Sequence, residues 1–297
     1  MSSPAPAQRV SVYLPSYNVA EFLAHCIEGL LAQTLPPDEI LVIDDGSGDA
    51  SAAIAAEFPR VTLIRHPANR GLGAVRNTAI RAARNELVAS IDADCVADPA
   101  WLAELAKNLA DPRIAGVGGA LIEGVQRTTA DRWRKVHMPQ QWGDAFIRNP
   151  RFLFGCNNLF RKSAVLDAGG YDETMRTNGE DADICARLRQ KGWDLAYDPA
   201  ARVTHLRHDT TGSILDAYWR WWRFGVRAYS KSVRLRAVVG HAFFVHFRYN
   251  FLQPALADFK ARRWNLLGLD FLVLGYFPYR DLRLWWEAKS EPSPRPD

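Results

Sequence analysis

The stretch Leu87-Val-Ala-Ser-Ile-Asp-Ala-Asp94 joins an apolar run to two carboxylates. The run 87–91 carries no charge and is typical of a strand that is buried on both faces of a parallel sheet. Asp92 and Asp94 follow at its end, and residues two apart in an extended chain point to the same side. Because two such carboxylates repel unless a cation lies between them, the pair favours Mg²⁺ or Mn²⁺. A loop of solvated acids is the alternative.

Three similar apolar runs precede this one, and a helical pattern follows each of them. The strands are expected at residues 10–14, 39–44 and 61–64, and the helices at 20–33, 49–57 and 71–84. Strands that alternate with helices of this length form βαβ units with right-handed crossovers. The sequence therefore predicts an α/β fold with a parallel sheet and helices on both faces.

Polar residues follow all four of these strands. Ligands of such a sheet bind beyond the carboxyl ends of its strands, so these residues are expected to form one composite site. They are Tyr17 and Asn18, Asp44 to Ser47, Asn69 to Gly71, and Asp92 with Asp94.

Two of these groups suit a nucleotide. The turn at Asp44-Asp45-Gly46-Ser47 can aim a carboxylate at a base N–H or a ribose hydroxyl, although Asp-Gly also favours a tight turn for its own sake. Asn69-Arg70-Gly71 precedes a helix that carries Arg76, and a helix N-terminus with arginines suits phosphate. A capped helix with exposed arginines is the alternative there.

The second half of the chain is less regular. Strands and a loop rich in Arg and Trp are expected over residues 112–160, helices over 161–169 and 180–191, and two short strands over 194–205.

Two further groups in this half could carry chemistry. Glu180, Asp181 and Asp183 open a helix and are candidates for a general base, although the helix dipole also favours acids there. Their spacing does not choose among the three. His205 follows the last strand, as does His208, and His205 is either a further metal ligand beside Asp94 or a structural histidine.

The composition is that of a globular protein. Of the 297 residues, 48% are hydrophobic and 24% are charged, which excludes disordered and collagen-like chains. The four cysteines are scattered and form no C-x-x-C pair, which excludes a disulfide scaffold and a cysteine-rich zinc site. The first nine residues hold no apolar segment typical of a secretory signal, and a cytoplasmic location is expected.

Positive charge gathers late in the chain, although the net charge is only +4. A helix over 214–234 would place aromatic side chains beside a row of five cations. The cations are Arg220, Arg223, Arg227, Lys231 and Arg234. This pattern favours an anionic membrane surface as partner, with a helix docked on the core as the alternative. The apolar stretches 237–257 and 264–279 are too polar or too short to span a bilayer, so they are expected as buried or interfacial helices.

The motifs resemble those of family 2 glycosyltransferases, in order and spacing, over residues 8–225. The matching stretches are Pro15-Ser-Tyr-Asn18, Ile43-Asp-Asp-Gly-Ser47, Asn69-Arg-Gly71, Arg76-Asn77, Asp92-Ala-Asp94, Gly155-Cys-Asn-Asn-Leu-Phe-Arg161, Gly169-Gly-Tyr-Asp172 and Glu180-Asp181. The resemblance implies a GT-A fold with a Rossmann-like, mostly parallel sheet. It implies a domain over 9–225, whose nucleotide-binding half is 9–110 and whose acceptor half is 111–225. A helical extension rich in aromatic and basic residues is expected over 226–291. The two ends of the chain, 1–8 and 292–297, are expected to be disordered.

The resemblance also implies inverting transfer from a nucleotide-diphosphate sugar, with UDP expected. Residues at the nucleotide or donor would be Pro15, Tyr17, Asn18, Asp44, Asp45, Asn69, Arg70, Arg76, Asp92 and Ala93. Mn²⁺ or Mg²⁺ would be held by Asp94, with Asp92 and His205. Asp181 would be the catalytic base, with Glu180 lining the acceptor pocket and Asn157 and Asn158 near the sugar. Cys156 stands where the family often has a smaller residue, so the resemblance makes no prediction for that part of the pocket.

The acceptor is expected to be a lipid-linked sugar or another cell-envelope glycan precursor, and the enzyme to lie peripherally on the cytoplasmic face of the membrane. A sugar nucleotidyltransferase is the nearest alternative, but it would open with a glycine-rich, basic phosphate loop. A dinucleotide oxidoreductase would show G-x-G-x-x-G after the first strand. A protein that only binds nucleic acid or another anion would leave Asp45, Asp92, Asp94 and Asp181 unexplained, so no nucleic-acid partner is expected.

Overall fold

A computed structural model describes residues 9–223 and 235–290 of the chain. The chain divides into two compact units. The first comprises Met1–Val125 and Gln140–Arg207, and the second Gln126–Pro139 and His208–Asp297. The first unit thus ends earlier than the predicted boundary at residue 225.

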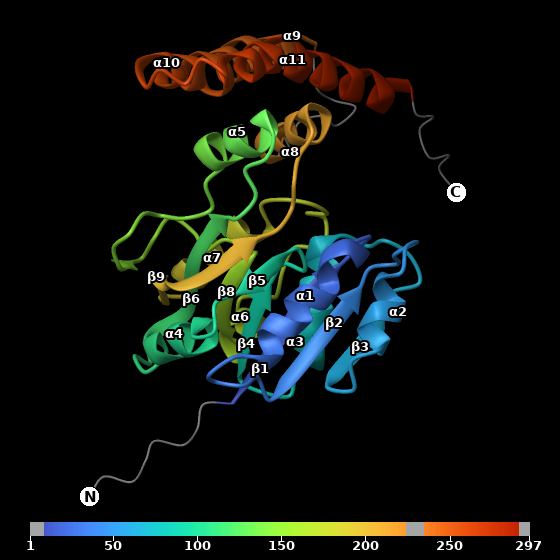
Figure 1. The fold of residues 1–297 in the computed structure, drawn as a ribbon, viewed down its shortest axis with the longest axis vertical. Coiled ribbons are helices and arrows are strands. Elements are labelled where there is room, and N and C mark those ends of the chain that lie inside the picture. The colour runs from blue at the N-terminus through green and yellow to red at the C-terminus, as the bar shows by residue number, and fades with distance from the viewer. Residues whose placement is uncertain (1–8, 224–234, 291–297) are drawn as a thin grey trace, which may run out of the picture. The chain divides into compact units, whose positions relative to one another are not determined.

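The first half of the first unit is a parallel α/β layer (Figure 1). Four strands lie in the order β3–β2–β1–β4, and every neighbouring pair is parallel. They are β1 (Val10–Ser16), β2 (Glu39–Asp44), β3 (Val61–Arg65) and β4 (Leu87–Ile91), connected by α1 (Ala20–Leu31), α2 (Ser51–Ala56) and α3 (Leu72–Ala82). These bounds agree with the predicted ones to within about two residues.

Beyond β4 the sheet becomes mixed. β8 (Asn157–Arg161) is antiparallel to β4 and to β6 (Ile114–Glu123). β9 (Asp194–His205) is parallel to β6 and antiparallel to β5 (Cys95–Ala97) and β7 (Ile147–Arg148). Helices α4 (Trp101–Asn108), α6 (Lys162–Asp167) and α7 (Glu180–Gln190) complete this half.

β9 is one strand, where the sequence predicts two short ones. A register shift opposite Gly118 and Ala120 takes up the extra residues around Asp198-Pro199. The proline lacks an N–H and so interrupts the ladder without ending the strand.

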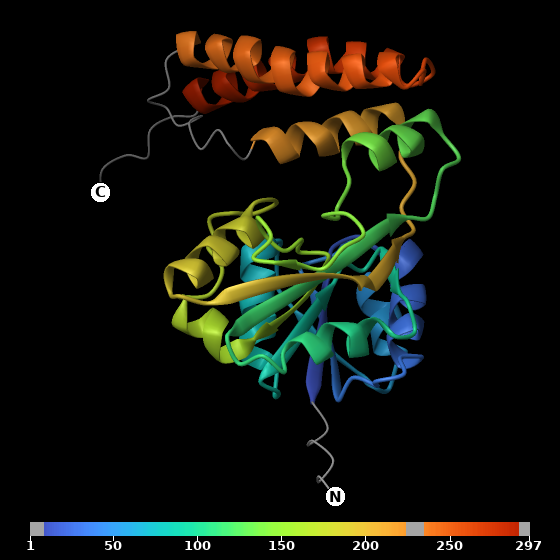
Figure 2. The ribbon, with the colours of Figure 1, turned by 90° about the vertical axis from the view of Figure 1, so that its left-hand side faces the viewer.

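Alternate strand residues face two separate cores. Val12 and Val42 belong to the core that α1, α2 and α4 cover, whereas Tyr13 and Leu41 belong to the core under α3, α6 and α7. Helices therefore lie on both faces of the sheet, as expected (Figure 2). Burial of both faces explains why the strands read as continuous apolar runs.

Helices make up the second unit. They are α5 (Thr129–His137), α8 (Thr211–Arg223), α9 (Leu235–His241), the π-helix η1 (Ala242–Leu252), α10 (Gln253–Lys260) and α11 (Leu267–Ser290). α9, η1 and α10 follow one another and pack along α11 (Figure 2). Among the described helices, we find none whose apolar stretch is long enough to cross a bilayer. Of the predicted basic helix over 214–234, residues 224–234 lie outside the described residues.

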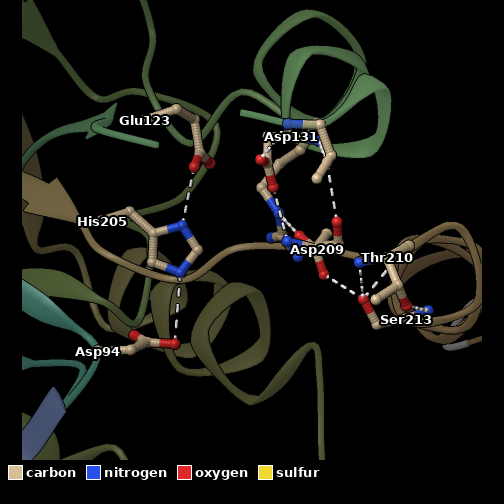
Figure 3. A network of polar contacts seen from close by, with 9 residues as sticks. Asp94, Glu123, Asp131, His205, Asp209, Thr210 and Ser213 are labelled. Carbon is tan, nitrogen blue, oxygen red and sulfur yellow. Dashed lines mark hydrogen bonds and ion pairs between the residues drawn. The ribbon is translucent and has the colours of Figure 1, made fainter. Parts of the chain in front are cut away.

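α5 occupies residues that the sequence predicts as strand or loop, and its start is capped. The Thr128 side chain accepts from the Asp131 N–H at 3.0 Å, and Asp131 accepts in turn from the Thr128 N–H at 2.8 Å. Asp131 also accepts from the backbone N–H of Asp209, whose carboxylate accepts from Ser213 at the start of α8 (Figure 3). The Thr-x-x-Asp spacing is a capping-box signal that the charge and tryptophan content of this region obscures.

Buried aspartates connect the helices of the second unit. Asp281 of α11 accepts from the Trp219 indole N–H at 2.8 Å, and its other oxygen lies 2.7 Å from His246 Nε2 and 3.2 Å from His241 Nδ1. Asp270 accepts from the Trp133 indole N–H at 2.8 Å. Asp281 therefore joins α11 to α8, α9 and η1, and Asp270 joins it to α5.

We predict that Asp281→Asn destabilises the folded chain by about 2–4 kcal/mol at neutral pH, because an amide cannot accept from all three donors. Burial alone would raise the pKa of Asp281, but the hydrogen bonds from His241, His246 and Trp219 outweigh it and hold the pKa well below its usual range. A lowered pKa stabilises the fold above about pH 4 and loses that effect as the pH falls. The difference between variant and wild type should therefore shrink in acid, as measured by urea unfolding.

The matched control is Glu287→Gln, because Glu287 lies exposed on the same helix and pairs with exposed Arg283 at 2.7 Å. Its unfolding free energy should change by less than about 0.5 kcal/mol. An Asp281→Asn variant as stable as this control would contradict the proposed role of the carboxylate.

Candidate functional site

Adjacent parallel strands bring their carboxyl ends to one edge of the sheet. β1, β2 and β4 are neighbours there, and they end at Ser16, Asp44 and Ile91. The predicted polar groups therefore gather as the parallel topology requires.

Asp45 anchors the loop that follows β3. Its carboxylate accepts from the backbone N–H groups of Arg70 and Gly71, at 3.0 and 2.8 Å, and lies 2.6 Å from His66 Nδ1. Gly71 has a φ of 93°, and a Cβ there would lie 2.7 Å from the Arg176 Cα. The loop before α3 thus depends on a carboxylate at one end and a glycine at the other.

The loops after β1 and β2 hold each other in place. Asn18 has a φ of 53°, and its side-chain oxygen accepts from the Gly48 N–H at 2.9 Å. Its own N–H donates to Ser47 Oγ at 3.0 Å. Tyr17, next to it, is 50% exposed. Asp44 is buried, accepts from the Ser47 N–H and lies 3.0 Å from Arg65 Nε.

Asn69 and Arg70 lie in the loop that Asp45 anchors. The Arg176 guanidinium donates to both oxygens of Asn69, the backbone one at 2.8 Å. Arg70 pairs with Glu173 at 3.0 Å, and both of these side chains are partly exposed. Arg70 therefore keeps a charged group at the surface of the site.

Asp94 and His205 lie side by side, as expected. Asp94 Oδ2 is 3.3 Å from His205 Nε2, and the other ring nitrogen of His205 is 2.8 Å from Glu123 Oε2 (Figure 3). Burial by itself lowers the pKa of His205, but its contacts with the carboxylates of Asp94 and Glu123 outweigh burial and raise the pKa to about 9. A cationic histidine thus lies between two acids.

These residues fit a divalent cation. With Glu123 accepting from Nδ1–H, a divalent cation would take the place of the Nε2 proton of His205, and the Nε2 lone pair would then face the cation on the side of Asp94, which is how carboxylates orient metal-binding histidines. Asp92 is half-buried, and desolvation together with the charge of Asp94 raises its pKa to about 6. A cation beside Asp94 would relieve that repulsion.

Arg76 is buried rather than facing solvent or a ligand. Its Nε donates to Glu180 Oε1 at 3.1 Å. Its Nη1 lies 2.9 Å from Ser90 Oγ, 3.1 Å from the Tyr13 hydroxyl and 3.2 Å from the Gly155 carbonyl oxygen. The resemblance implied a neighbour of the nucleotide; instead, the guanidinium joins β1, β4 and the start of α7, because a buried cation requires this many acceptors.

Asp181 and Asp92 both contact the short segment 155–156. The Gly155 N–H donates to Asp181 Oδ2 at 3.0 Å, and the Asp92 N–H donates to the Cys156 carbonyl at 3.3 Å. Burial, and then the charge of Glu180, raise the pKa of Asp181 to about 7. A candidate base that titrates near neutrality is therefore held close to the end of β4.

The two asparagines that follow have different surroundings. Asn157 is fully buried, donates to the carbonyls of Ala120 and Ala201, and accepts from the Trp101 indole N–H at 2.7 Å. These contacts use all the hydrogen-bonding groups of its amide except one lone pair, so Asn157 connects strands rather than facing the site. Asn158 donates to the Phe154 carbonyl, and its oxygen has no hydrogen-bond partner among the described residues.

Several residues of the site escaped the sequence interpretation. Glu123 orients His205, but it is recognisable only from the register of β6 and β9, which places the two residues opposite each other. His66 binds Asp45 and lies 3.0 Å from Thr78 Oγ1. Tyr13 sits within a strand whose pattern is otherwise apolar, and a hydroxyl in a buried strand is the signal that could have revealed it.

The arrangement combines three chemical capabilities in the first unit. Asp94 and His205 can hold a cation, Asp181 can accept a proton near neutral pH, and Arg70 with the start of α3 can contact an anionic group. The combination suits a reaction in which a phosphorylated group leaves while a hydroxyl attacks.

Relatives of known class match the same part of the chain. Residues 11–169 match the family described as Glycosyl transferase family 2. The chain is 30% identical over 210 residues to a pre-mycofactocin glycosyltransferase of Mycobacterium tuberculosis, covering 67% of this chain and 43% of that protein. It is 26% identical over 247 residues to a glucosyl-dolichyl phosphate glucuronosyltransferase of Haloferax volcanii, covering 76% of this chain and 77% of that one. The chain thus spans about half the length of the first of these relatives.

Solved structures share the fold. A mannosyltransferase of Pyrobaculum calidifontis, in complex with GDP-Man and Mn²⁺, superposes with a TM-score of 0.57 at 17% identity, covering 96% of this chain and 89% of that one. The structure of GalNAc-T7 with UDP, GalNAc and Mn²⁺ gives a TM-score of 0.54 at 17% identity, covering 67% of this chain and 44% of that one. The expected GT-A fold with extra C-terminal helices is confirmed. The family match extends over more than half of the chain, which therefore belongs to glycosyl transferase family 2.

Proposed function

We propose that the chain transfers a sugar, with inversion, from a nucleotide-diphosphate donor to a hydroxyl group, with Asp181 as general base and Asp94 at the metal. One observation carries the proposal. The segment 155–156 contacts the Asp92 backbone on one side and the Asp181 carboxylate on the other, at 3.3 and 3.0 Å. A donor bound at the end of β4 would therefore meet the base without any rearrangement of the sheet.

The donor would occupy the edge formed by β1, β2 and β4. We assign Tyr17, Asp44 and Asp45 to the nucleoside, with Pro15, Asn18, Asn69, Arg70, Asp92 and Ala93 around it. Tyr17 offers an exposed ring, and Arg70 an exposed charge. A UDP-sugar is the donor we propose, and one solved neighbour was obtained with UDP and another with GDP-Man.

Mn²⁺ or Mg²⁺ would be held by Asp94 and His205, with Asp92 nearby. Both solved neighbours contain Mn²⁺. A divalent cation on the diphosphate stabilises the charge that develops on the leaving group. Glu123 fixes the ring of His205 in the orientation that this requires, because it accepts from the other nitrogen.

Asp181 would take the proton of the attacking hydroxyl. Its carboxylate is held by the N–H groups of Gly155 and Ala182, at 3.0 and 2.8 Å. The attack comes from the face opposite the leaving diphosphate, so a single displacement inverts the anomeric configuration. Glu180 and Asn158 would line the acceptor pocket, since each has a buried oxygen without a hydrogen-bond partner in the described chain. Arg76 would act through Glu180.

For the acceptor we propose a lipid-linked sugar or another cell-envelope glycan precursor, reached at the cytoplasmic face of the membrane. The Haloferax relative is named as acting on glucosyl-dolichyl phosphate. A second relative, from Staphylococcus epidermidis, is a poly-beta-1,6-N-acetyl-D-glucosamine synthase with 28% identity over 225 residues, covering 71% of this chain and 53% of that one.

Asp181→Asn should lower kcat by about 10²–10⁴-fold and leave nucleotide binding unchanged, because the amide cannot accept the proton. In the wild type, kcat/KM should fall by about tenfold per pH unit below neutrality, since Asp181 must be ionised and its pKa is raised. Asp183→Asn is the matched control, because Asp183 lies on the same helix and pairs with Arg187 at 2.7 Å. Near-normal kcat in Asp181→Asn would refute the assignment.

A panel of UDP, dTDP, GDP and ADP, each with and without Mn²⁺, should give one base-specific, metal-dependent rise in melting temperature. A ligand at about 100 times its Kd adds about 2.7 kcal/mol. Asp94→Asn should lose the metal-dependent part of that rise, whereas Asp111→Asn, on the surface of the same unit, should keep it. A full metal-dependent rise in Asp94→Asn would rule out the proposed metal site.

Arg76→Met should cost about 3–5 kcal/mol of unfolding free energy, because it leaves Glu180 buried without its cation. Arg81→Met on the same helix is the control, since the Arg81 side chain is 58% exposed and lies 3.8 Å from Glu173. Its cost should stay under about 1 kcal/mol. Urea unfolding of both variants measures the difference, and equal costs would show that Arg76 is not a structural hub.

A further inference from the structure

The second unit exposes most of the large apolar side chains that reach the surface. Sixteen of the twenty exposed large hydrophobic residues in the described part of the chain lie between residues 235 and 286. Phe244 and Trp286, at 69% and 68%, are the most exposed of them. Such an accumulation of exposed apolar side chains in one unit marks a surface that meets another apolar phase.

These exposed side chains are distinct from the hydrophobic core of the second unit. α11 turns Leu269, Val273 and Phe277 inward, where they pack against residues of α5 and α8. Its exposed side carries other residues, namely Phe271, Leu272, Leu274, Tyr279, Leu282 and Trp286. The unit therefore has a complete interior and a second, outward apolar surface.

Ring contacts connect the exposed side chains of two helices. The ring of Phe243 stacks on Phe247 at 5.8 Å, and Phe247 contacts Phe251 at 5.7 Å. Phe251 is itself buried and contacts the exposed Phe271 of α11 at 5.2 Å. The chain of rings thus runs along η1 and crosses to α11. We call the exposed apolar side chains of residues 235–286 the aromatic face.

The exposed charges around the aromatic face are mostly positive. Among described residues 235–290, the aspartates Asp258, Asp270 and Asp281 are all at 0% exposure, and the one exposed acid is Glu287. The exposed cations are Arg236, Arg248, Lys260, Arg262, Arg283 and Lys289. The described residues 235–290 therefore bury three of their four acids and present cations beside aromatic rings.

We propose that the aromatic face docks on the interface of a lipid bilayer that contains anionic lipids. Aromatic side chains are favoured at the boundary between hydrocarbon and headgroups, and arginines beside them pair with lipid phosphates. A second copy of the chain is a poorer occupant, because two such faces would bring Arg236 and Arg248 against like charges. The inference extends the membrane-bound acceptor of the proposed function, and its test does not depend on transfer activity.

Flotation of the full chain with vesicles tests the proposal. The chain should bind phosphatidylcholine vesicles that contain about 30% phosphatidylglycerol, and binding should weaken at about 0.5 M salt because screening removes the electrostatic part. Pure phosphatidylcholine vesicles should bind less. Vesicles with brominated acyl chains should quench tryptophan fluorescence, and Trp264→Phe/Trp286→Phe should lose most of that quenching.

Two variants separate the apolar from the ionic contribution. Phe243→Ser/Phe244→Ser/Phe271→Ser should weaken binding by at least about tenfold. Arg236→Gln/Arg248→Gln should weaken binding to anionic vesicles by roughly fivefold for each cation. Leu166→Ser, at an exposed position of α6 in the first unit, is the control and should bind as the wild type does. Melting temperatures confirm that each variant is folded.

The outcomes are separable from those of the proposed function. No binding to anionic vesicles at low salt would overturn the inference, as would unchanged binding of the triple phenylalanine variant. A second copy would be the occupant instead if light scattering found that the wild type is a dimer, that the triple phenylalanine variant is a monomer and that neither binds vesicles. That result would also overturn the inference. Nucleotide-induced thermal shifts should be the same in all these variants, so a failed donor site would appear there and not in the flotation.

Discussion

One buried guanidinium organises the site of the first unit. Arg76 is 2% exposed and donates to groups of β1, β4, the segment before β8 and the start of α7. A buried cation costs several kcal/mol unless acceptors surround it, so each of these elements is fixed relative to the others. Gly155 is part of the arrangement, since a Cβ there would lie 2.2 Å from Arg76 Nη2. The Gly155 N–H then holds Asp181, which makes the position of the base a consequence of the buried cation.

Two acids of the site have a structural and a chemical role at once. Asp45 and Asp181 both accept hydrogen bonds from backbone N–H groups. Such bonds favour the ionised form of Asp181. For Asp181, burial and Glu180 outweigh those bonds, and its pKa rises. The two aspartates differ because Asp181 has a second acid beside it, whereas His66 and the loop N–H groups surround Asp45. The same residue type thus gives an anchor in one place and a candidate base in the other.

The parallel half of the sheet could be predicted from the sequence because both of its faces are buried. Apolar runs such as 39–44 and 87–91 then mark the strands directly, and polar residues mark their ends. The second half could not be predicted to the same depth. The partner of His205 is Glu123, which lies 82 positions away and becomes visible only through the β6–β9 register. α5 was missed because charged side chains, Asp131 and Arg134, occupy two of its four buried positions, so that its apolar stripe is short.

The role of Arg76 illustrates a general limit of motif-based assignment. An arginine at the start of a helix near a phosphate site has two physical uses, to face the anion or to support the acids around it. Spacing is the same in both cases, and only the identity of the acceptors decides between them. Here the acceptors are Glu180, Ser90, Tyr13 and a backbone carbonyl, all within the protein.

Burial of acids has a different consequence in the second unit. Asp258 lies against Arg263 and His137, at 2.8 and 3.0 Å, and Asp281 against Trp219 and two histidines. Burial raises the pKa of Asp270 to about 7, so this carboxyl is largely neutral below that pH. Each of these acids therefore has at least one hydrogen-bond or ion-pair partner inside the helical layer and is withdrawn from the surface. A surface that carries cations and aromatic rings repels a second surface of the same charge. The same surface is attracted to the interface of a bilayer that contains anionic lipids. The hydrogen bonds that hold these aspartates inside the helical layer thus leave the surface of the second unit with an excess of cations.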